Sequence, residues 1–150
     1  GPPGGREVSL GGNIDDVARI AAAAGSTLQA GGDVPEGAAA LHYAGTFVQQ
    51  ADEDGLIASV EALEEQEDGD STVAGVVDAL RFLGLEDESE QVSAAFNWSE
   101  AGYPVDEGSG VKARDVRAAL DARFEESLDA ERLEEVAAER IGEQPEAFGR

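Results

Sequence analysis

Residues 70–85 read DSTVAGVVDALRFLGL and form the most apolar helix-like stretch of the chain. Its large apolar residues recur at the spacing of one helical face, which is the pattern of a helix packed against a core. They are Val73, Val76, Val77, Leu80 and Leu83. Asp70 or Ser71 can cap the amino end, and Gly84 stands where a left-handed residue commonly ends a helix. The stretch therefore predicts a helix with one buried face.

Similar apolar faces recur on both sides of this stretch. Capping residues or turn glycines punctuate them: Asn13, Gly25, Asp33, Gly55, Asp87, Ser127, Asp129 and Gly142. No segment shows the sustained alternation of apolar and polar residues that marks a strand. We therefore expect an all-α fold, a small irregular bundle of six or seven short helices with arms rich in Gly and Pro.

A chain of 150 residues is expected to form one domain. We predict an extended N-terminal arm over residues 1–12, a single helical domain over 13–142 and a C-terminal tail over 143–150. Within the domain, residues 97–110 are rich in Gly and Pro and contain the only Trp, so they predict a long loop. Long loops with aromatic residues in compact domains frequently carry function.

The chain is strongly acidic. Its net charge is −23 at pH 7, and the middle third holds fifteen acidic residues against one base, Arg81. Leu, Ile, Val and Phe together number 33, so the core is small. Repulsion among carboxylates weakens a small core, and molar salt removes most of it by shortening the Debye length to about 3 Å. The composition resembles that of cytosolic proteins from salt-in halophilic archaea, with an ordinary acidic protein as the alternative.

The composition also bears on the cellular setting. The chain has no Cys, which excludes a disulfide framework and a cysteine-based metal site. No apolar run approaches the roughly 18 residues of a membrane span, and no signal peptide is visible. We expect a cytoplasmic protein of a salt-in cell or a component of a large assembly. The chain begins Gly-Pro-Pro-Gly-Gly without Met, which leaves processing, a cleavage scar and truncation open.

Motifs for catalysis are missing from the sequence. His42 is the only His, and no acidic residue is spaced to orient it as a catalytic base. The patterns of nucleophile elbows, zinc proteases, P-loops and dinucleotide-binding turns do not occur. The acidic residues are too numerous to single out a pair for acid–base work. We expect a protein that is not an enzyme and has no cofactor.

One stretch resembles an EF-hand calcium loop. That loop needs oxygen ligands at alternating positions, a central Gly and a closing Glu. Gly55 stands at the central position, and the candidate metal ligands are Gln50, Asp52, Asp54, Leu56 and Glu61. Gln in place of the first Asp removes a charged ligand, and a second loop is not evident. The alternative is an acidic turn between two helices, so calcium is a possible but not an expected partner.

The C-terminal segment 133–148 resembles a helix-turn-helix. Ala138 and Gly142 have the spacing that lets two helices cross closely, but the second helix would carry glutamates where DNA binding needs positive charge. Arg114 and Arg117 belong to the only basic cluster and share a helix face that can contact phosphate. They can equally pair with acidic residues on the same helix. We do not expect nucleic acid as a partner.

The leading hypothesis is a non-enzymatic assembly or adaptor subunit adapted to high salt, in a larger complex or a virion. A marginal core and helix faces of small residues suit close packing against a protein partner or a second copy. Apolar residues outside the helical faces are the candidate partner contacts: Val8, Leu10, Trp98, Tyr103 and Phe148. Burial against their own core is the alternative for them. A helix-turn-helix transcription regulator or fragment of one, and an EF-hand-like calcium-binding protein, are the other hypotheses.

Overall fold

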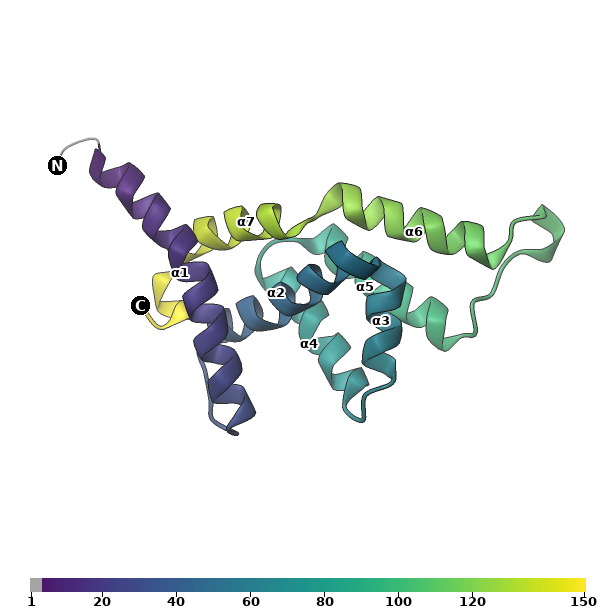
Figure 1. The fold of residues 1–150 in the computed structure, drawn as a ribbon, viewed down its shortest axis with the longest axis horizontal. Coiled ribbons are helices and arrows are strands. Elements are labelled where there is room, and N and C mark those ends of the chain that lie inside the picture. Colours follow the sequence, from purple (N-terminus) through teal and green to yellow (C-terminus); the bar gives the residue numbers. More distant parts are fainter. Residues whose placement is uncertain (1–3) are drawn as a thin grey trace.

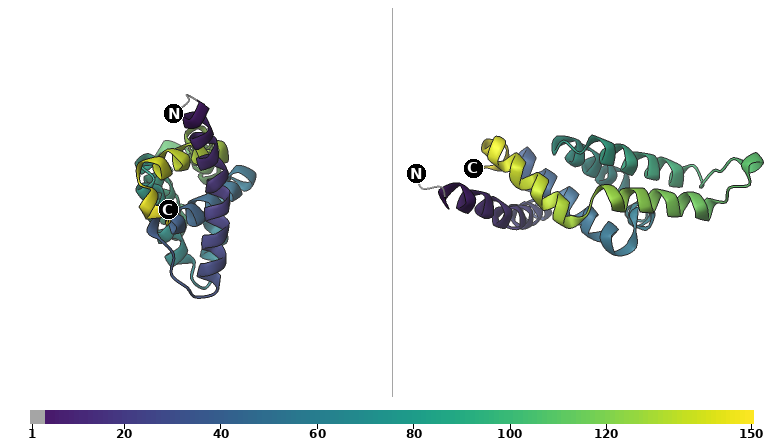
Figure 2. Two further views of the ribbon diagram at one scale, coloured as in Figure 1. Left: turned by 90° about the vertical axis from the view of Figure 1, so that its left-hand side faces the viewer. Right: turned by 90° about the horizontal axis from the view of Figure 1, so that it is seen from above.

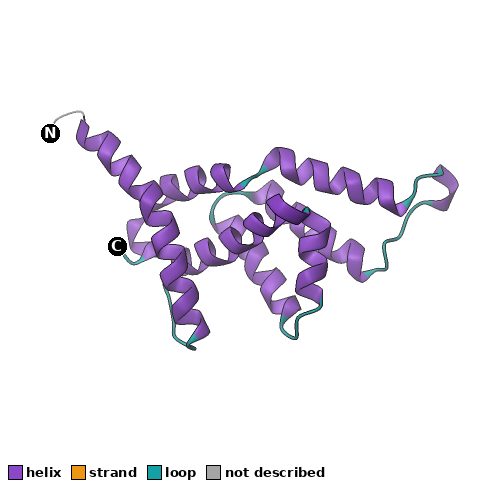
Figure 3. Ribbon diagram, in the orientation of Figure 1, coloured by secondary structure: helices purple, strands orange, loops and turns teal. Residues whose placement is uncertain are grey.

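The computed structural model describes the backbone of residues 4–150 and the side chains from Ile14 onward. Within that part of the chain it contains helices and loops but no strand, so the all-α prediction is confirmed (Figure 3). The elements are α1 (Gly4–Gln29), α2 (Glu36–Asp54), α3 (Leu56–Glu64), α4 (Gly69–Phe82), α5 (Glu86–Glu100), η1 (Glu107–Ser109), α6 (Ala113–Ser127), α7 (Ala130–Glu143) and η2 (Pro145–Phe148).

Helix α2 lies at the centre of the bundle and packs against α1, α3, α4 and α7 (Figure 1). It is buried on more than one side, with Leu41, Ala44, Phe47 and Val48 almost inaccessible to solvent. Small residues such as Ala44 let neighbouring helices approach closely, which compensates for the shortage of large apolar side chains.

Helix α4 forms as the sequence predicts. Val73, Val76 and Leu80 are buried against α2 and α5. Gly84 adopts a φ of 82°, and the N–H of Leu85 donates to the carbonyl of Leu80 at 2.8 Å. This is the hydrogen bond of a left-handed helix C-terminus, in which glycine avoids the steric cost of a side chain.

Helices α6 and α7 follow one another along one side of the molecule, and α5 runs alongside α6 (Figure 2). Phe124 and Leu128, near the junction of α6 and α7, are buried in the common core. Phe124 meets Phe47 of α2 edge to face, with ring centroids 6.2 Å apart. Asp129 begins α7 by accepting a hydrogen bond from the N–H of Arg132 at 2.7 Å.

Helix α1 packs against α2 and α7. Asp16, a residue of α1 itself, is buried and forms ion pairs with Arg19, one turn further along the helix, and with Arg150 at the other end of the chain. A buried carboxylate needs such partners to offset its loss of hydration. Asp16 therefore attaches α1 to the C-terminal segment.

Two predicted boundaries are wrong. Residues 4–12 are helical rather than an extended arm, and residues 1–3 lie outside the described residues. Prolines are tolerated before and within a first helical turn, so their presence does not prevent a helix from starting at Gly4. The predicted loop over 97–110 begins only after Glu100, because the buried face of α5 continues through the polar Ser99.

Candidate functional site

A recess of about 330 Å³ lies between α3, the end of α5, the connection from α5 to α6, and α6. Its lining residues are Glu61, Trp98, Tyr103, Ala113, Arg114 and Arg117. We call it the Trp98 recess. From the sequence, five of these residues are predicted to serve three unrelated roles, namely partner contact, calcium binding and nucleic-acid contact. The fold brings the five together in one place.

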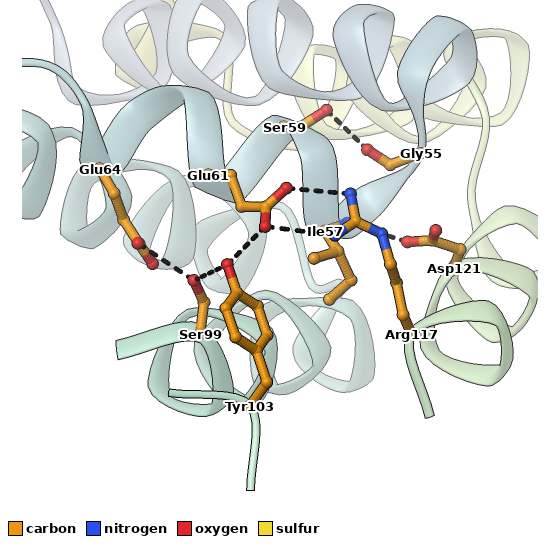
Figure 4. A network of polar contacts seen from close by, with 9 residues as sticks. All are labelled: Gly55, Ile57, Ser59, Glu61, Glu64, Ser99, Tyr103, Arg117 and Asp121. Atoms are coloured by element: carbon orange, nitrogen blue, oxygen red, sulfur yellow. Dashed lines mark hydrogen bonds and ion pairs between the residues drawn. The ribbon is translucent and has the colours of Figure 1, made fainter. Parts of the chain in front are cut away.

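Glu61, Tyr103 and Arg117 form a hydrogen-bonded group on one wall of the recess, which we call the clasp (Figure 4). The guanidinium of Arg117 donates two hydrogen bonds to the Glu61 carboxylate, at 2.9 and 3.2 Å, and the Tyr103 hydroxyl donates to the same carboxylate. A bidentate, charge-assisted pair of this kind is geometrically specific. The clasp therefore joins α3, the α5–α6 connection and α6, which are far apart in the sequence.

The clasp changes the proton affinities of its members. The hydrogen bonds from Arg117, and then from Tyr103, lower the pKa of Glu61 below its ordinary value of 4.5. The hydrogen bond to Glu61 raises the pKa of Tyr103 above its ordinary value of 10.0. The same carboxylate raises the pKa of Arg117. Each shift favours the protonation state that completes the clasp.

Ser99 extends the clasp toward a second carboxylate. Its hydroxyl lies 3.0 Å from Glu64 Oε2 and 3.2 Å from the Tyr103 hydroxyl. Because the hydroxyl has one proton, it can donate to only one of them, and a carboxylate is the stronger acceptor. The other oxygen of Glu64 is buried without a hydrogen-bond partner among the described residues. Both carboxylate oxygens of Glu61 therefore accept hydrogen bonds, whereas only one oxygen of Glu64 does so among the described residues.

Tyr103 is held in an unusual backbone conformation. Its φ is 62°, in the left-handed region that residues other than glycine rarely adopt. Its N–H donates to the carbonyl of Trp98 at 2.9 Å, and its ring meets the Trp98 ring edge to face at 5.0 Å. Trp98 in turn donates its indole N–H to the carbonyl of Pro104 at 2.8 Å. These contacts hold both aromatic rings at the recess.

Arg114 supplies an available positive charge at the recess. It is exposed and makes no ion pair or side-chain hydrogen bond within the described residues, whereas Arg117 is occupied by Glu61. Val111, just before α6, is one of the exposed large apolar residues, with 43% of its surface accessible. The arrangement can accept an apolar or aromatic side chain against Trp98 and a carboxylate at Arg114.

The other predicted partner contacts lie elsewhere. Phe148 is only 4% exposed, and its ring packs edge to face on Phe82 with centroids 6.0 Å apart. The prediction that Phe148 contacts a partner is therefore wrong, because its side chain completes the core of its own chain. The side chains of Val8 and Leu10 lie outside the described residues.

The stretch that resembles a calcium loop is helical on both sides of Gly55. Gln50, Asp52 and Asp54 lie in the last turns of α2, and α3 begins at Leu56. Asp52 accepts a hydrogen bond from the backbone N–H of Ala130, and Glu61 belongs to the clasp. Among the described residues, no group of three or more His, Cys, Asp or Glu side chains is placed to hold a metal ion. The fold does not bring these candidates into a calcium loop.

The C-terminal segment does not form a helix-turn-helix. Gly142 lies inside α7 rather than at a turn, and α7 is followed by the short 3₁₀ helix η2. Within residues 143–150 there is thus no second helix long enough to enter a DNA groove. Pro145 and the burial of Phe148 turn the chain back onto the core instead.

The clasp could not be predicted from the sequence. Tyr103 is 42 positions from Glu61 in the sequence, and Arg117 is 56 positions from it. No local spacing therefore relates the three residues. The one available signal is that Tyr103 and Trp98 lie close together in the stretch that the sequence predicts as a loop, although Trp98 belongs to the end of α5.

Comparison with protein-family models, with curated proteins and with solved structures finds no match. None of the described helices combines the length and the hydropathy needed to cross a membrane.

Proposed function

We propose that the protein is a non-enzymatic assembly or adaptor subunit that binds a protein partner through the Trp98 recess. The observation that carries the proposal is the half-buried Trp98 beside the exposed Arg114, in one recess held by the clasp. Trp, Tyr and Arg are the residues that most often dominate the energy of protein interfaces.

The clasp favours binding because it orders the recess before a partner arrives. Trp98 and Tyr103 are already fixed by hydrogen bonds and by their mutual packing, so little side-chain entropy is lost on association. A stable interface buries about 1,600 Å² in total, which is more than one recess provides. The exposed Val111 and the outer face of α6 extend the proposed contact surface.

The recess also indicates the chemistry of the partner. Its aromatic walls suit an apolar or aromatic side chain, and Arg114 suits a carboxylate next to it. We propose that the contact forms in concentrated salt, because the net charge of −23 otherwise opposes association with another acidic protein. Under those conditions the apolar insertion supplies most of the affinity, and Arg114 sets the orientation.

The test is capture and light scattering in about 3 M KCl, where surface charges are screened. We expect the protein to form a defined oligomer or to retain a specific partner, identified by mass spectrometry. Arg114→Glu should weaken that association, whereas Arg123→Glu, an exposed position on the same helix outside the recess, should not. A monomer that retains nothing would overturn the proposal, and so would equal losses in the two variants.

A further inference from the structure

A second recess, of about 630 Å³, lies between α1, α2, α4 and the turn from α3 to α4. It shares no lining residue with the Trp98 recess. Its volume falls in the range of roughly 300–1,000 Å³ that is usual for small-molecule sites. We call it the His42 groove, after the only histidine of the chain.

Two aromatic rings form the inner wall of the His42 groove, and each rests on a glycine of a neighbouring helix. A Cβ atom on Gly25 of α1 would lie 2.8 Å from Nδ1 of His42, and one on Gly75 of α4 would lie 3.2 Å from the Tyr43 ring. The rings of His42 and Tyr43 meet edge to face at 5.5 Å. The two glycines thus make the space in which this pair of rings is held.

The floor of the groove is apolar. Phe47, Leu63 and Val76 line it and are all buried. Because they belong to the main core, the floor is as firmly packed as the core itself. A flat apolar ring can rest on this floor beside the His42–Tyr43 pair.

Four polar side chains of the groove are not used by the fold. Within the described residues, no hydrogen bond or ion pair involves the side chains of His42, Tyr43, Gln50 or Gln66. Asp68 is the only acidic residue of the lining, and no Arg or Lys is present there. The groove therefore offers one carboxyl group together with several hydrogen-bond donors and acceptors.

We propose that the His42 groove binds a small organic cation that carries a flat apolar ring. The ring lies on Phe47 beside the His42–Tyr43 pair, and the cationic group faces Asp68. An ammonium group is also attracted by the faces of aromatic rings such as Tyr43. This proposal is independent of the Trp98 recess and of the adaptor function.

The test uses three probes with one ring system and different charge: 1-naphthylmethylamine, 1-naphthalenemethanol and 1-naphthoate. Nuclear magnetic resonance at one fixed pH and salt concentration gives a single set of imidazole signals for His42 and a single indole N–H signal for Trp98. We expect the amine to shift the His42 signals saturably and to leave Trp98 unchanged. The alcohol should bind more weakly, and the carboxylate should not bind.

Matched variants test the contacts. Asp68→Asn should raise the Kd of the amine about two- to fivefold, the range for one partly exposed ion pair, and Asp70→Asn should not change it. Both carboxylates are exposed, but only Asp68 lines the groove. Ser26→Phe, from an exposed position on α1, should fill the groove and abolish binding, whereas Glu53→Phe, at an exposed position of α2 that does not line the groove, should not.

Several results would overturn the proposal. They are the absence of a saturable His42 shift with the amine, equal binding of all three probes, and equal effects of Asp68→Asn and Asp70→Asn. A His42 shift that depends on protein concentration without any probe would assign the groove to a second copy of the chain instead.

Discussion

The carboxylate of Asp121 on α6 accepts a hydrogen bond at 2.9 Å from the backbone N–H of Ile57, in the first turn of α3. Gly55, which precedes α3, has no side chain with which to cap that turn. A Cβ atom at Gly55 would lie 3.1 Å from Asp121 Oδ2, so the glycine also makes room for the cap. In the same way, Asp52 of α2 accepts from the N–H of Ala130 at the start of α7.

Loss of this cap should destabilise the fold. Asp121→Ala is expected to lower the free energy of unfolding by about 1 kcal/mol, the usual cost of an N-cap. Denaturant unfolding in high salt measures the change. Glu126→Ala, an exposed position on the same helix, is the control and should have little effect. Equal effects would contradict the capping role.

Glu61 should make stability depend on acidic pH. Because Arg117 lowers its folded pKa below 4.5, the clasp contributes stability above that pH and loses it as the pH falls through the folded pKa. Glu61→Gln should be less stable at neutral pH, by about 1 kcal/mol or less after solvent screening, and should lose less stability on acidification. Parallel curves of unfolding free energy against pH for the two proteins would contradict the pairing.

Tyr103 should titrate at high pH. Glu61 raises its pKa above 10.0 in the folded state, so the contribution of this hydroxyl to stability is present below pH 10 and is lost as the pH rises through the folded pKa. Tyrosinate absorbance in a Tyr43→Phe background isolates Tyr103, since the chain has two tyrosines. Glu61→Gln in that background should move the midpoint back toward 10; an unchanged midpoint would argue against the hydrogen bond.

The segment after α7 should be essential for stability. Phe148→Ala is expected to cost about 3–5 kcal/mol, as for other buried aromatic residues. Gly37→Ala should also destabilise the fold, because a Cβ atom there would lie 2.7 Å from the Phe148 ring. Glu146→Ala, which is exposed in the same short helix, serves as the control for both. A Phe148→Ala protein as stable as this control would show that the segment is dispensable.

Salt should stabilise the protein. We expect the free energy of unfolding to rise between about 0.1 and 3 M KCl as the Debye length shortens. A variant with Glu53→Gln, Glu65→Gln and Glu67→Gln removes three exposed charges from one acidic region and should be more stable at low salt and less salt-dependent. Cooperative unfolding of the unchanged chain at low salt, with the same salt response as the variant, would contradict the salt adaptation.

The sequence predicts those parts of the fold that depend on local spacing. The buried Val73, Val76 and Leu80 of α4 and the left-handed Gly84 follow directly from helical periodicity and capping preferences. The end of α5 is missed because its buried face continues through Ser99, a polar residue that periodicity does not count. The burial of Phe148 is missed because a short tail with Pro145 carries no periodic signal.

The candidate site could be predicted only as separate pieces. Trp98 and Tyr103 are noticed as aromatic residues outside the apolar faces, and Arg117 as part of a basic cluster. Their association with Glu61 depends on how α3, α5 and α6 pack, which is set by core contacts elsewhere. The contacts of Gly25 with His42 and of Gly75 with Tyr43 also depend on helix packing. They could not be predicted, because a glycine within a helix does not indicate which ring lies against it.

The ion pair of Asp16 with Arg150 has a consequence for synthesis on the ribosome. The two residues are 134 positions apart, and α1 also packs against α7. As the chain emerges, α2 follows α1 directly and can pack against it early, whereas α7 and Arg150 leave the exit tunnel last. The contacts of α1 with α7 and with Arg150 are therefore among the last to form.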